Sequence, residues 1–167
     1  MNLATINAWT DEEAIASFRR CCGSTRWSER MARLRPFDSE AAVFETAERI
    51  WWELDSADWL EAFAAHPRIG DRDAMRAKFA ATAAWSAREQ SGVDGAAEDV
   101  LQALAEENTR YHERFGYIFI VSATGKTAAE MLALLRERLS NEPGREIAVA
   151  AAEQAKITRL RLEKLSP

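Results

Sequence analysis

The sequence predicts an all-α protein, a single-domain helical bundle over residues 1–167 with one buried extended connector. Ala, Leu, Glu and Arg dominate the chain, β-branched residues are sparse, and the seven Gly and four Pro cluster at a few breaks. A chain of 167 residues can bury one sizeable core but is too short for two well-packed ones, so we expect one domain.

Capping signals and breaks define the expected helices. Thr10-Asp11-Glu12-Glu13 and Thr127-Ala128-Ala129-Glu130 are capping-box patterns, in which a Thr hydroxyl and a Glu carboxylate satisfy free N–H groups at a helix start. Gly and Pro residues interrupt the helical pattern between segments. We expect helices over about residues 10–20, 25–34, 39–52, 55–65, 73–90, 95–114, 127–139 and 145–165.

One apolar segment does not fit a helix. Residues 117–123 are rich in β-forming side chains, and their number suits a buried strand. No second strand is available to pair with them. We therefore expect an extended connector that is buried in the bundle.

The charge pattern makes nucleic acid and membranes poor partners. The formal net charge is -5, the pI is about 5.2, and Lys and Arg are mixed with Glu along most of the chain, so a broad phosphate-binding face is not expected. No apolar run reaches the length of a membrane span. We expect the six tryptophans to pack in the core rather than to form a stacking platform for bases.

Cysteine usage and the chain ends favour a cytoplasmic location. Cys21 and Cys22 are adjacent, cannot form an ordinary disulfide with each other and lack the spacing of metal ligands, which suits a reducing compartment. The N-terminus has neither the basic start nor the long apolar stretch of a secretory signal. The C-terminal residues do not form a peroxisomal address.

His66 is the first candidate functional residue. Pro67 disfavours a helical conformation at the residue before it, so His66 should adopt an extended or turn conformation just past the helix expected over 55–65. Gly70 then allows the chain to reverse. A histidine held at such a point can transfer a proton near neutral pH. Alternatively, it is a loop histidine that caps a backbone carbonyl.

A second candidate cluster lies at the end of the helix expected over 73–90. Its apolar stripe continues into Ser86 and Gln90, with Glu89 beside them. Because these residues are three and four positions apart, their side chains can project into one space. Glu89 could accept protons or hydrogen bonds from a polar ligand; equally, this helix end could simply be exposed to water.

The last helix carries a third candidate, Arg161. It falls at the edge of a face that we expect to be buried, marked by Ile147, Ala150, Ile157 and Leu160. An arginine in such an apolar neighbourhood can extend its guanidinium to water or pair with a carboxylate. It can also bind a carboxylate or a urea-like group of a ligand through two-point contacts that lysine cannot match.

Two further motifs resemble cofactor sites but are incomplete. His112-Glu113-Arg114-Phe115 begins like the zinc-protease motif but lacks a second histidine one turn on, so no metal site is expected. Residues 123–127 resemble the end of a phosphate-binding loop but lack its upstream glycine. Nucleotide binding is therefore not expected.

Five groups of segments match one known family in order and spacing. They are Arg35-Pro36-Phe37; Asp58-Trp59-Leu60-Glu61-Ala62-Phe63 with His66-Pro67-Arg68-Ile69-Gly70-Asp71; Ser86-Ala87-Arg88-Glu89-Gln90; Tyr111-His112-Glu113-Arg114-Phe115-Gly116 with Phe119-Ile120-Val121-Ser122-Ala123; and Lys156-Ile157-Thr158-Arg159-Leu160-Arg161-Leu162. Together they resemble the 2-oxo-4-hydroxy-4-carboxy-5-ureidoimidazoline (OHCU) decarboxylases of uric acid degradation. Each segment alone is a weak signal, but the combination is specific and covers nearly the whole chain.

The resemblance implies an all-helical, cofactor-free enzyme that converts the small-molecule ureidoimidazoline stereospecifically into (S)-allantoin with loss of carbon dioxide. Such a decarboxylation is chemically reasonable without a metal or an organic electron sink, because the departing electrons can move into the adjacent ring carbon–nitrogen double bond. The protein then has only to orient and protonate its substrate. Members of the family are often dimers, so a homodimer is compatible with the resemblance, although no pattern in this chain marks an interface.

The resemblance also implies residue roles. His66 would be the general acid, or would hold the proton delivered to one face of the ring; Glu89 would bind the hydroxyl or ureido hydrogens and could act as a base; Arg161 would pair with substrate oxygens. Free N–H and C=O groups of the connector would meet the donors and acceptors of the planar ring, and its apolar side chains would keep water away. The implied lining residues are Pro67, Ser86, Gln90, Phe119, Ile120, Val121, Ser122 and Ala123.

Two other functions remain open from the sequence. One is a helical interaction module whose inward polar residues form a buried network and catalyse nothing. The other is hydrolysis or isomerisation of a related ureido compound, because the same polar groups would suit several planar amides.

Overall fold

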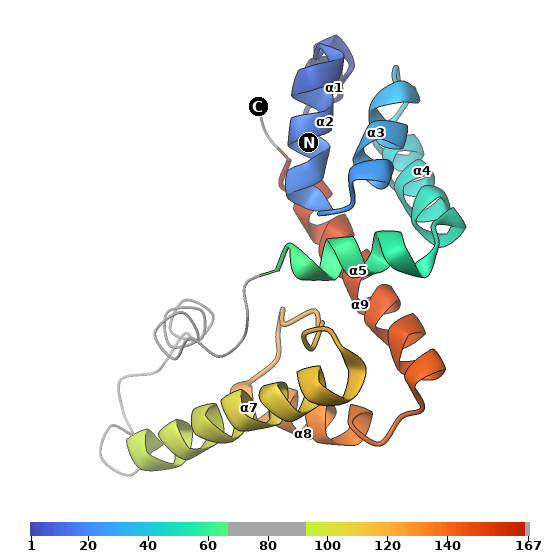
Figure 1. The fold of residues 1–167 in the computed structure, drawn as a ribbon. Helices are drawn as coiled ribbons and strands as arrows, with labels where there is room; N and C mark the ends of the chain where they lie inside the picture. Colours follow the sequence, from blue (N-terminus) through green and yellow to red (C-terminus); the bar gives the residue numbers. More distant parts are fainter. Residues whose placement is uncertain (67–92, 166–167) are drawn as a thin grey trace. The chain divides into compact units, whose positions relative to one another are not determined.

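The computed structural model describes residues 1–66 and 93–165, and all regular secondary structure within these ranges is helical (Figure 1). The all-α prediction is therefore confirmed. The helix expected over 73–90 lies outside the described residues. The helices are α1 (Leu3–Ala8), α2 (Asp11–Cys21), α3 (Thr25–Arg33), α4 (Glu40–Glu53), α5 (Ser56–Ala64), α7 (Val93–Phe115), α8 (Ala128–Arg138) and α9 (Pro143–Glu163).

Both predicted capping boxes are present. The Thr10 hydroxyl accepts from the Glu13 N–H at 3.2 Å while the Glu13 carboxylate accepts from the Thr10 N–H at 2.9 Å, and Thr127 and Glu130 repeat this arrangement at the start of α8. These contacts satisfy N–H groups that have no partner inside the helix. The helix starts predicted from capping signals are therefore confirmed.

Two helix starts differ from the prediction. The chain already forms α1 at Leu3, because the Asn2 side chain accepts a hydrogen bond from the Thr5 N–H at 3.2 Å and so caps a short helix. Helix α9 begins at Pro143, two residues before the expected start. Proline is well suited to the first helical position, where its missing N–H would have no intrahelical partner.

The extended connector is also confirmed. Residues 117–123 follow α7 without helical or strand structure, and Gly116 ends α7 with a φ of 81°, a conformation that favours glycine. The side chains of Phe119 and Ile120 are almost completely buried. Burial without strand pairing is the arrangement expected from an apolar segment that lacks a partner strand.

The described helices belong to two compact units. The first comprises Met1–His66 and Val149–Pro167, and therefore includes α1 to α5 and most of α9. The second comprises Pro67–Ala148, and includes α7, α8, the connector and the first residues of α9.

The indole N–H groups of three tryptophans form hydrogen bonds between helices of the first unit. Trp27 of α3 donates through Nε1 to the Ala47 carbonyl of α4 at 3.0 Å, and Trp51 of α4 donates to the Ala151 carbonyl of α9 at 2.9 Å. Trp59 of α5 donates to the Trp51 carbonyl at 3.1 Å. Each ring buries a large apolar surface and satisfies its polar N–H, so it fixes both the separation and the register of two helices.

The prediction that all tryptophans pack in the core is wrong for Trp52. Its side chain is 45% exposed, whereas that of the preceding residue, Trp51, is 2% exposed. Adjacent residues on a helix point about 100° apart, so a doublet cannot direct both rings at the same core. Trp85 lies outside the described residues.

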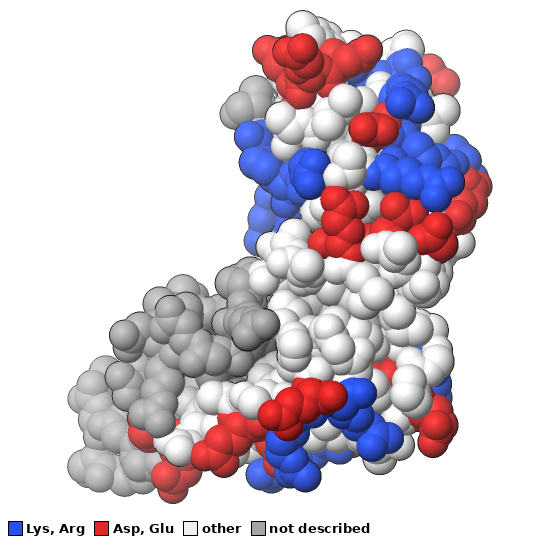
Figure 2. Space-filling view, in the orientation of Figure 1, with Lys and Arg blue, Asp and Glu red and all other residues white. Residues whose placement is uncertain are grey.

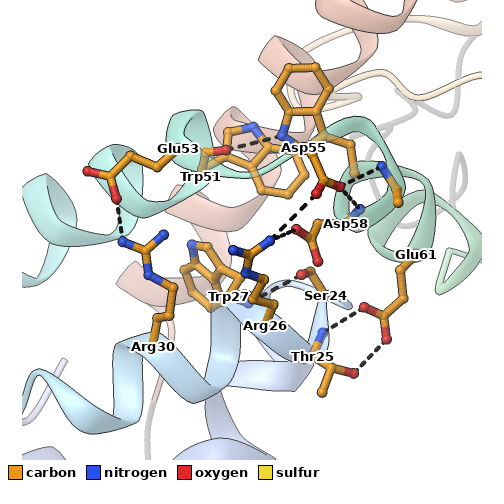
Figure 3. A network of polar contacts seen from close by, with 12 residues as sticks. Ser24, Thr25, Arg26, Trp27, Arg30, Trp51, Glu53, Asp55, Asp58 and Glu61 are labelled. Atoms are coloured by element: carbon orange, nitrogen blue, oxygen red, sulfur yellow. Dashed lines mark hydrogen bonds and ion pairs between the residues drawn. The ribbon is translucent and has the colours of Figure 1, made fainter.

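Glu61 of α5 anchors this helix to the start of α3 (Figure 3). Its carboxylate accepts from the backbone N–H of Thr25 at 2.9 Å and from the Thr25 hydroxyl at 2.5 Å. Thr25 is the first residue of α3, where unpaired N–H groups favour a negative charge. The hydrogen bond from the Thr25 hydroxyl is the main cause that lowers the pKa of Glu61. The C-terminal end of α5 is thus held beside α3.

The loop between α2 and α3 touches the end of α5 at Gly23. A Cβ atom added to this glycine would lie 2.3 Å from the Cβ of Ala65 and 3.3 Å from the carbonyl oxygen of Ala62. No real side chain tolerates the first of these distances, so the close approach requires a glycine. Ala65 immediately precedes His66, and the contact therefore helps to set where His66 stands.

We expect Gly23→Ala to lower the free energy of unfolding by about 1–3 kcal/mol, because the methyl group must push the loop and α5 apart. The matched control is Gly144→Ala in the first turn of α9, where an added Cβ meets nothing within 4 Å. That variant should be unchanged or about 0.5 kcal/mol more stable. Urea unfolding of both variants measures the difference. Equal stability of the Gly23→Ala variant and the parent protein would contradict this close packing.

Candidate active site

His66 stands directly after α5, in a bend, as the following proline predicts. Its backbone N–H donates to the Phe63 carbonyl at 3.1 Å, and its side chain is half-buried. The ring nitrogen Nε2 lies 2.6 Å from Oε1 of Gln154 on α9. The hydrogen bond of Nε2 therefore joins His66 to a side chain of another helix and not to a backbone carbonyl.

Gln154 continues this contact into a chain of buried polar groups. Its side chain is 0% exposed, and its Nε2 donates to Oγ1 of Thr158, one turn further along α9, at 3.1 Å. The Thr158 side chain in turn hydrogen-bonds the thiol of Cys22. Each of these groups has a partner, as buried polar groups in native structures generally do. The imidazole is thus attached to a satisfied polar network inside the first unit.

The buried face of α9 differs from the one expected. Ala150 is buried as predicted, but Ile147, Ile157 and Leu160 are only half-buried, so the prediction for these three is wrong. The pattern of apolar residues predicted the wrong face of α9, because several of the most buried positions hold polar residues whose side chains are hydrogen-bonded. These positions repeat every four residues and are Glu146, Ala150, Gln154, Thr158 and Leu162.

Arg161 lies on the same face of α9 as Gln154 and Thr158, because it follows them by seven and three residues. Its side chain is half-buried, and Nη1 donates to the carbonyl of Cys21 at 3.3 Å. Cys21 is the last residue of α2, where carbonyls lack intrahelical partners and a positive charge is favoured. His66 therefore contacts, through Gln154, the face of α9 that carries Arg161, and Gln154 and Arg161 lie about 10 Å apart along the helix axis at 1.5 Å per residue.

The two cysteine thiols beside this face are buried and free. Burial raises the pKa of Cys21 to about 11, against an opposing effect of the Arg161 charge. Burial likewise raises the pKa of Cys22 to about 12, opposed by hydrogen bonds with Ser24 and Thr158. Both thiols are therefore protonated at neutral pH and are poor nucleophiles.

The raised thiol pKa values predict a loss of stability in alkali. Unfolded cysteines ionise near pH 8.5, so between about pH 8.5 and 11 the folded state holds protons that the unfolded state has released, and stability falls as pH rises through this window. Urea unfolding at pH 8 and pH 10 should show a smaller loss for the Cys21→Ala/Cys22→Ala double variant than for the parent protein. An identical pH dependence of the two proteins would contradict the assignment.

The connector of the second unit is held by a buried ion pair. Nη1 of Arg138 donates to the Ile120 carbonyl at 2.8 Å, and the guanidinium stacks over the Phe119 ring at 4.6 Å. The same guanidinium lies 2.6 Å from Oε1 of Glu146, which also accepts from the Tyr111 hydroxyl. Burial, followed by the hydrogen bond to Glu146, raises the pKa of Tyr111. The network satisfies a fully buried carboxylate and fixes the course of the connector.

Three backbone carbonyls of the connector, which we expected to be free for a ligand, accept hydrogen bonds within the protein. Besides the Ile120 carbonyl, the Ser122 carbonyl accepts from Nζ of Lys126 at 2.8 Å, and the Ala123 carbonyl accepts from the Lys126 N–H at 3.1 Å. The prediction that these groups are free is therefore wrong for three carbonyls, because the turn after residue 123 uses those of Ser122 and Ala123, and the Arg138 guanidinium binds that of Ile120. The side chains of Phe119, Ile120, Val121 and Ser122 are buried, and that of Ala123 is half-buried.

The remaining candidate residues, Pro67, Ser86, Glu89 and Gln90, lie outside the described residues.

Among the described ranges, 1–66 and 93–165, no group of three or more His, Cys, Asp or Glu side chains could hold a metal ion. On the face drawn in Figure 2, acidic and basic side chains are interspersed. In that same part of the chain, none of the helices combines the length and the apolar character that crossing a membrane requires.

The described part of the chain thus defines an all-helical protein in which a histidine contacts the face of the last helix that carries an arginine. A family model described as OHCU decarboxylase matches residues 7–163. The chain belongs to the OHCU decarboxylase family.

Individual relatives agree with the family model. The chain is 44% identical over 149 residues to the "Uric acid degradation bifunctional protein TTL" of Arabidopsis thaliana, covering 87% of this chain and 45% of that protein, so it spans less than half of that relative. It is 29% identical to the OHCU decarboxylase of Amia calva, covering 99% of this chain and 94% of the relative. A crystal structure of an OHCU decarboxylase in the presence of (S)-allantoin superposes with a TM-score of 0.73 at 41% identity, covering 94% and 98% of the two chains.

Sequence reasoning missed the residues that hold the candidate ones in place. Gln154 and Thr158 contact or support His66, and Arg138 and Glu146 support the connector. A usable signal was present for three of them: Glu146, Gln154 and Thr158 are spaced by multiples of four, which places polar residues on one stripe of a helix. No local signal marks Arg138, because its partners come from distant segments.

Proposed function

We propose that this protein decarboxylates 2-oxo-4-hydroxy-4-carboxy-5-ureidoimidazoline to (S)-allantoin in uric acid degradation, without a cofactor. The observation that carries the proposal is that His66 contacts Gln154 on the face of α9 that carries Arg161, and both His66 and Arg161 lie within segments that resemble the family. Family membership and the named relatives support the same reaction.

In the proposed reaction His66 is the proton donor. The bond between the carboxylate and the ring carbon that bears the hydroxyl breaks, carbon dioxide leaves, and the electron pair forms a double bond to the adjacent ring carbon, while the nitrogen of the former carbon–nitrogen double bond takes up a proton. His66 then delivers a proton to that adjacent carbon from one side, which sets the configuration of the product, and the hydroxyl gives up its proton and becomes a carbonyl. A half-buried imidazole with a fixed hydrogen-bond partner suits this role, because its ring is oriented before the substrate arrives.

The other proposed roles concern substrate binding. Arg161 pairs with substrate oxygens through its planar fork, and Glu89 binds the hydroxyl or ureido hydrogens and serves as a base when the hydroxyl becomes a carbonyl. The resemblance assigns the lining of the pocket to eight further residues, and we retain that assignment as part of the proposal. They are Pro67, Ser86, Gln90, Phe119, Ile120, Val121, Ser122 and Ala123.

The proposal extends to the organisation of the protein. We propose that residues 1–167 form one catalytic domain, since the family model matches residues of both units. We also propose a cytoplasmic enzyme that acts on a small molecule, since two buried thiols suit a reducing compartment. A homodimer is the assembly that the resemblance favours.

The activity is tested by generating the unstable substrate from urate with the upstream enzymes and following the chiral product by circular dichroism. Accelerated formation of (S)-allantoin with release of carbon dioxide supports the proposal. Racemic allantoin at the uncatalysed rate would support a helical interaction module instead. Accelerated turnover of a ureido compound without trapped carbon dioxide would indicate hydrolysis or isomerisation.

We expect His66→Ala to lower turnover by roughly a hundredfold or more with the fold intact, because a positioned proton donor is lost. The chain offers one matched control, His112→Ala, since the only other histidine lies on α7. That variant should keep turnover close to that of the parent protein. Full turnover of the His66→Ala variant, or an equal loss in both variants, would remove the assigned role.

A further inference from the structure

We propose that Gln154 is a positioning residue that fixes the tautomer of His66, with Thr158 holding the Gln154 amide in the required orientation. This inference rests on the proposed function, because it concerns the proton that His66 delivers. It assigns roles to two residues of α9 that have no part in the binding and proton-transfer roles given above.

The amide of Gln154 is oriented by its two neighbours. Its Nε2 donates to Oγ1 of Thr158 at 3.1 Å, which leaves Oε1 directed at the imidazole, 2.6 Å from Nε2 of His66. Gln154 is fully buried, and a reversed amide would place its NH2 group against Nε2 of His66, which the imidazolium required of a proton donor cannot accept. The carbonyl side of the amide therefore faces His66.

An amide carbonyl accepts hydrogen bonds and cannot donate them, so Nε2 of His66 must carry a hydrogen. This holds for the neutral ring and for the cation alike. In the neutral ring the hydrogen bond made by one nitrogen decides which tautomer is present. Nδ1 is then the nitrogen that gains and loses the second proton.

The selected tautomer fits the direction of proposed proton transfer. The imidazolium carries hydrogens on both nitrogens; when Nδ1 gives its proton to the ring carbon of the substrate, the neutral ring that remains has its hydrogen on Nε2. That is the form to which Gln154 is bonded. The contact therefore stabilises the product state of the histidine without any rearrangement of its protons.

The tautomer can be measured without activity, in the protein labelled with nitrogen-15. Long-range proton–nitrogen spectra distinguish the two neutral forms, and His66→Ala assigns the signals because the chain has two histidines. The parent protein should show His66 with hydrogen on Nε2. Hydrogen on Nδ1 would overturn the proposal, and this arm requires no variant of Gln154 to fold.

Variants then test whether Gln154 is the cause. Gln154→Leu should mix the tautomers of His66 and lower kcat about tenfold or more with a smaller change in KM, while the His112 signals stay the same. The control is Gln102→Leu, an exposed glutamine of α7, which should change neither. An unchanged tautomer of His66 in the Gln154→Leu variant would overturn the proposal.

Two substitutions of Thr158, one that removes its hydroxyl and one that keeps it, test the role of this residue. Thr158→Val removes the oxygen that accepts from Nε2 of Gln154 and should weaken the tautomer preference, whereas Thr158→Ser keeps an oxygen and should restore most of it. Equal spectra of these two variants would contradict the role of Thr158. If the protein forms no (S)-allantoin but shows the expected tautomers, only the proposed function fails; if it forms (S)-allantoin with the wrong tautomer, only this inference fails.

Discussion

The hydrogen bond of 2.6 Å between His66 and Gln154 joins the end of α5 to the middle of α9, and the candidate site depends on it. This contact restrains the orientation of a histidine that follows the last turn of a helix. With it, the ring is attached to the same helix face that carries Arg161. This contact thus places His66 at the helix face that carries Arg161, although the two residues are distant in sequence.

Packing elsewhere in the first unit makes this contact geometrically available. The indole of Trp51 sets the register of α9 against α4 through Ala151, and the carboxylate of Glu61 holds α5 against the start of α3. The absence of a side chain at Gly23 lets the α2–α3 loop reach the end of α5. Each interaction fixes the position of one segment that forms the site, so small changes in packing should shift the imidazole of His66.

Local signals predicted the fold well and the support of the site poorly. Capping boxes such as Thr10 with Glu13, and the bend before Pro67, are decided by neighbouring residues and were predictable. Resemblance singled out His66 and Arg161. Gln154 was missed because a buried glutamine is identified by its partners, which lie 88 residues away in the case of His66. Apolar periodicity likewise selected the wrong face of α9, since it cannot recognise polar residues that are satisfied inside a core.

The central claim is that His66 and Arg161 act on the same substrate at one face of α9. A crystal structure of this protein with (S)-allantoin bound tests it most directly. We expect hydrogen bonds from the product to both side chains, with Nε2 of His66 still bonded to Gln154. Product bound away from either residue, or a His66 ring turned from Gln154 towards the ligand through Nε2, would contradict it.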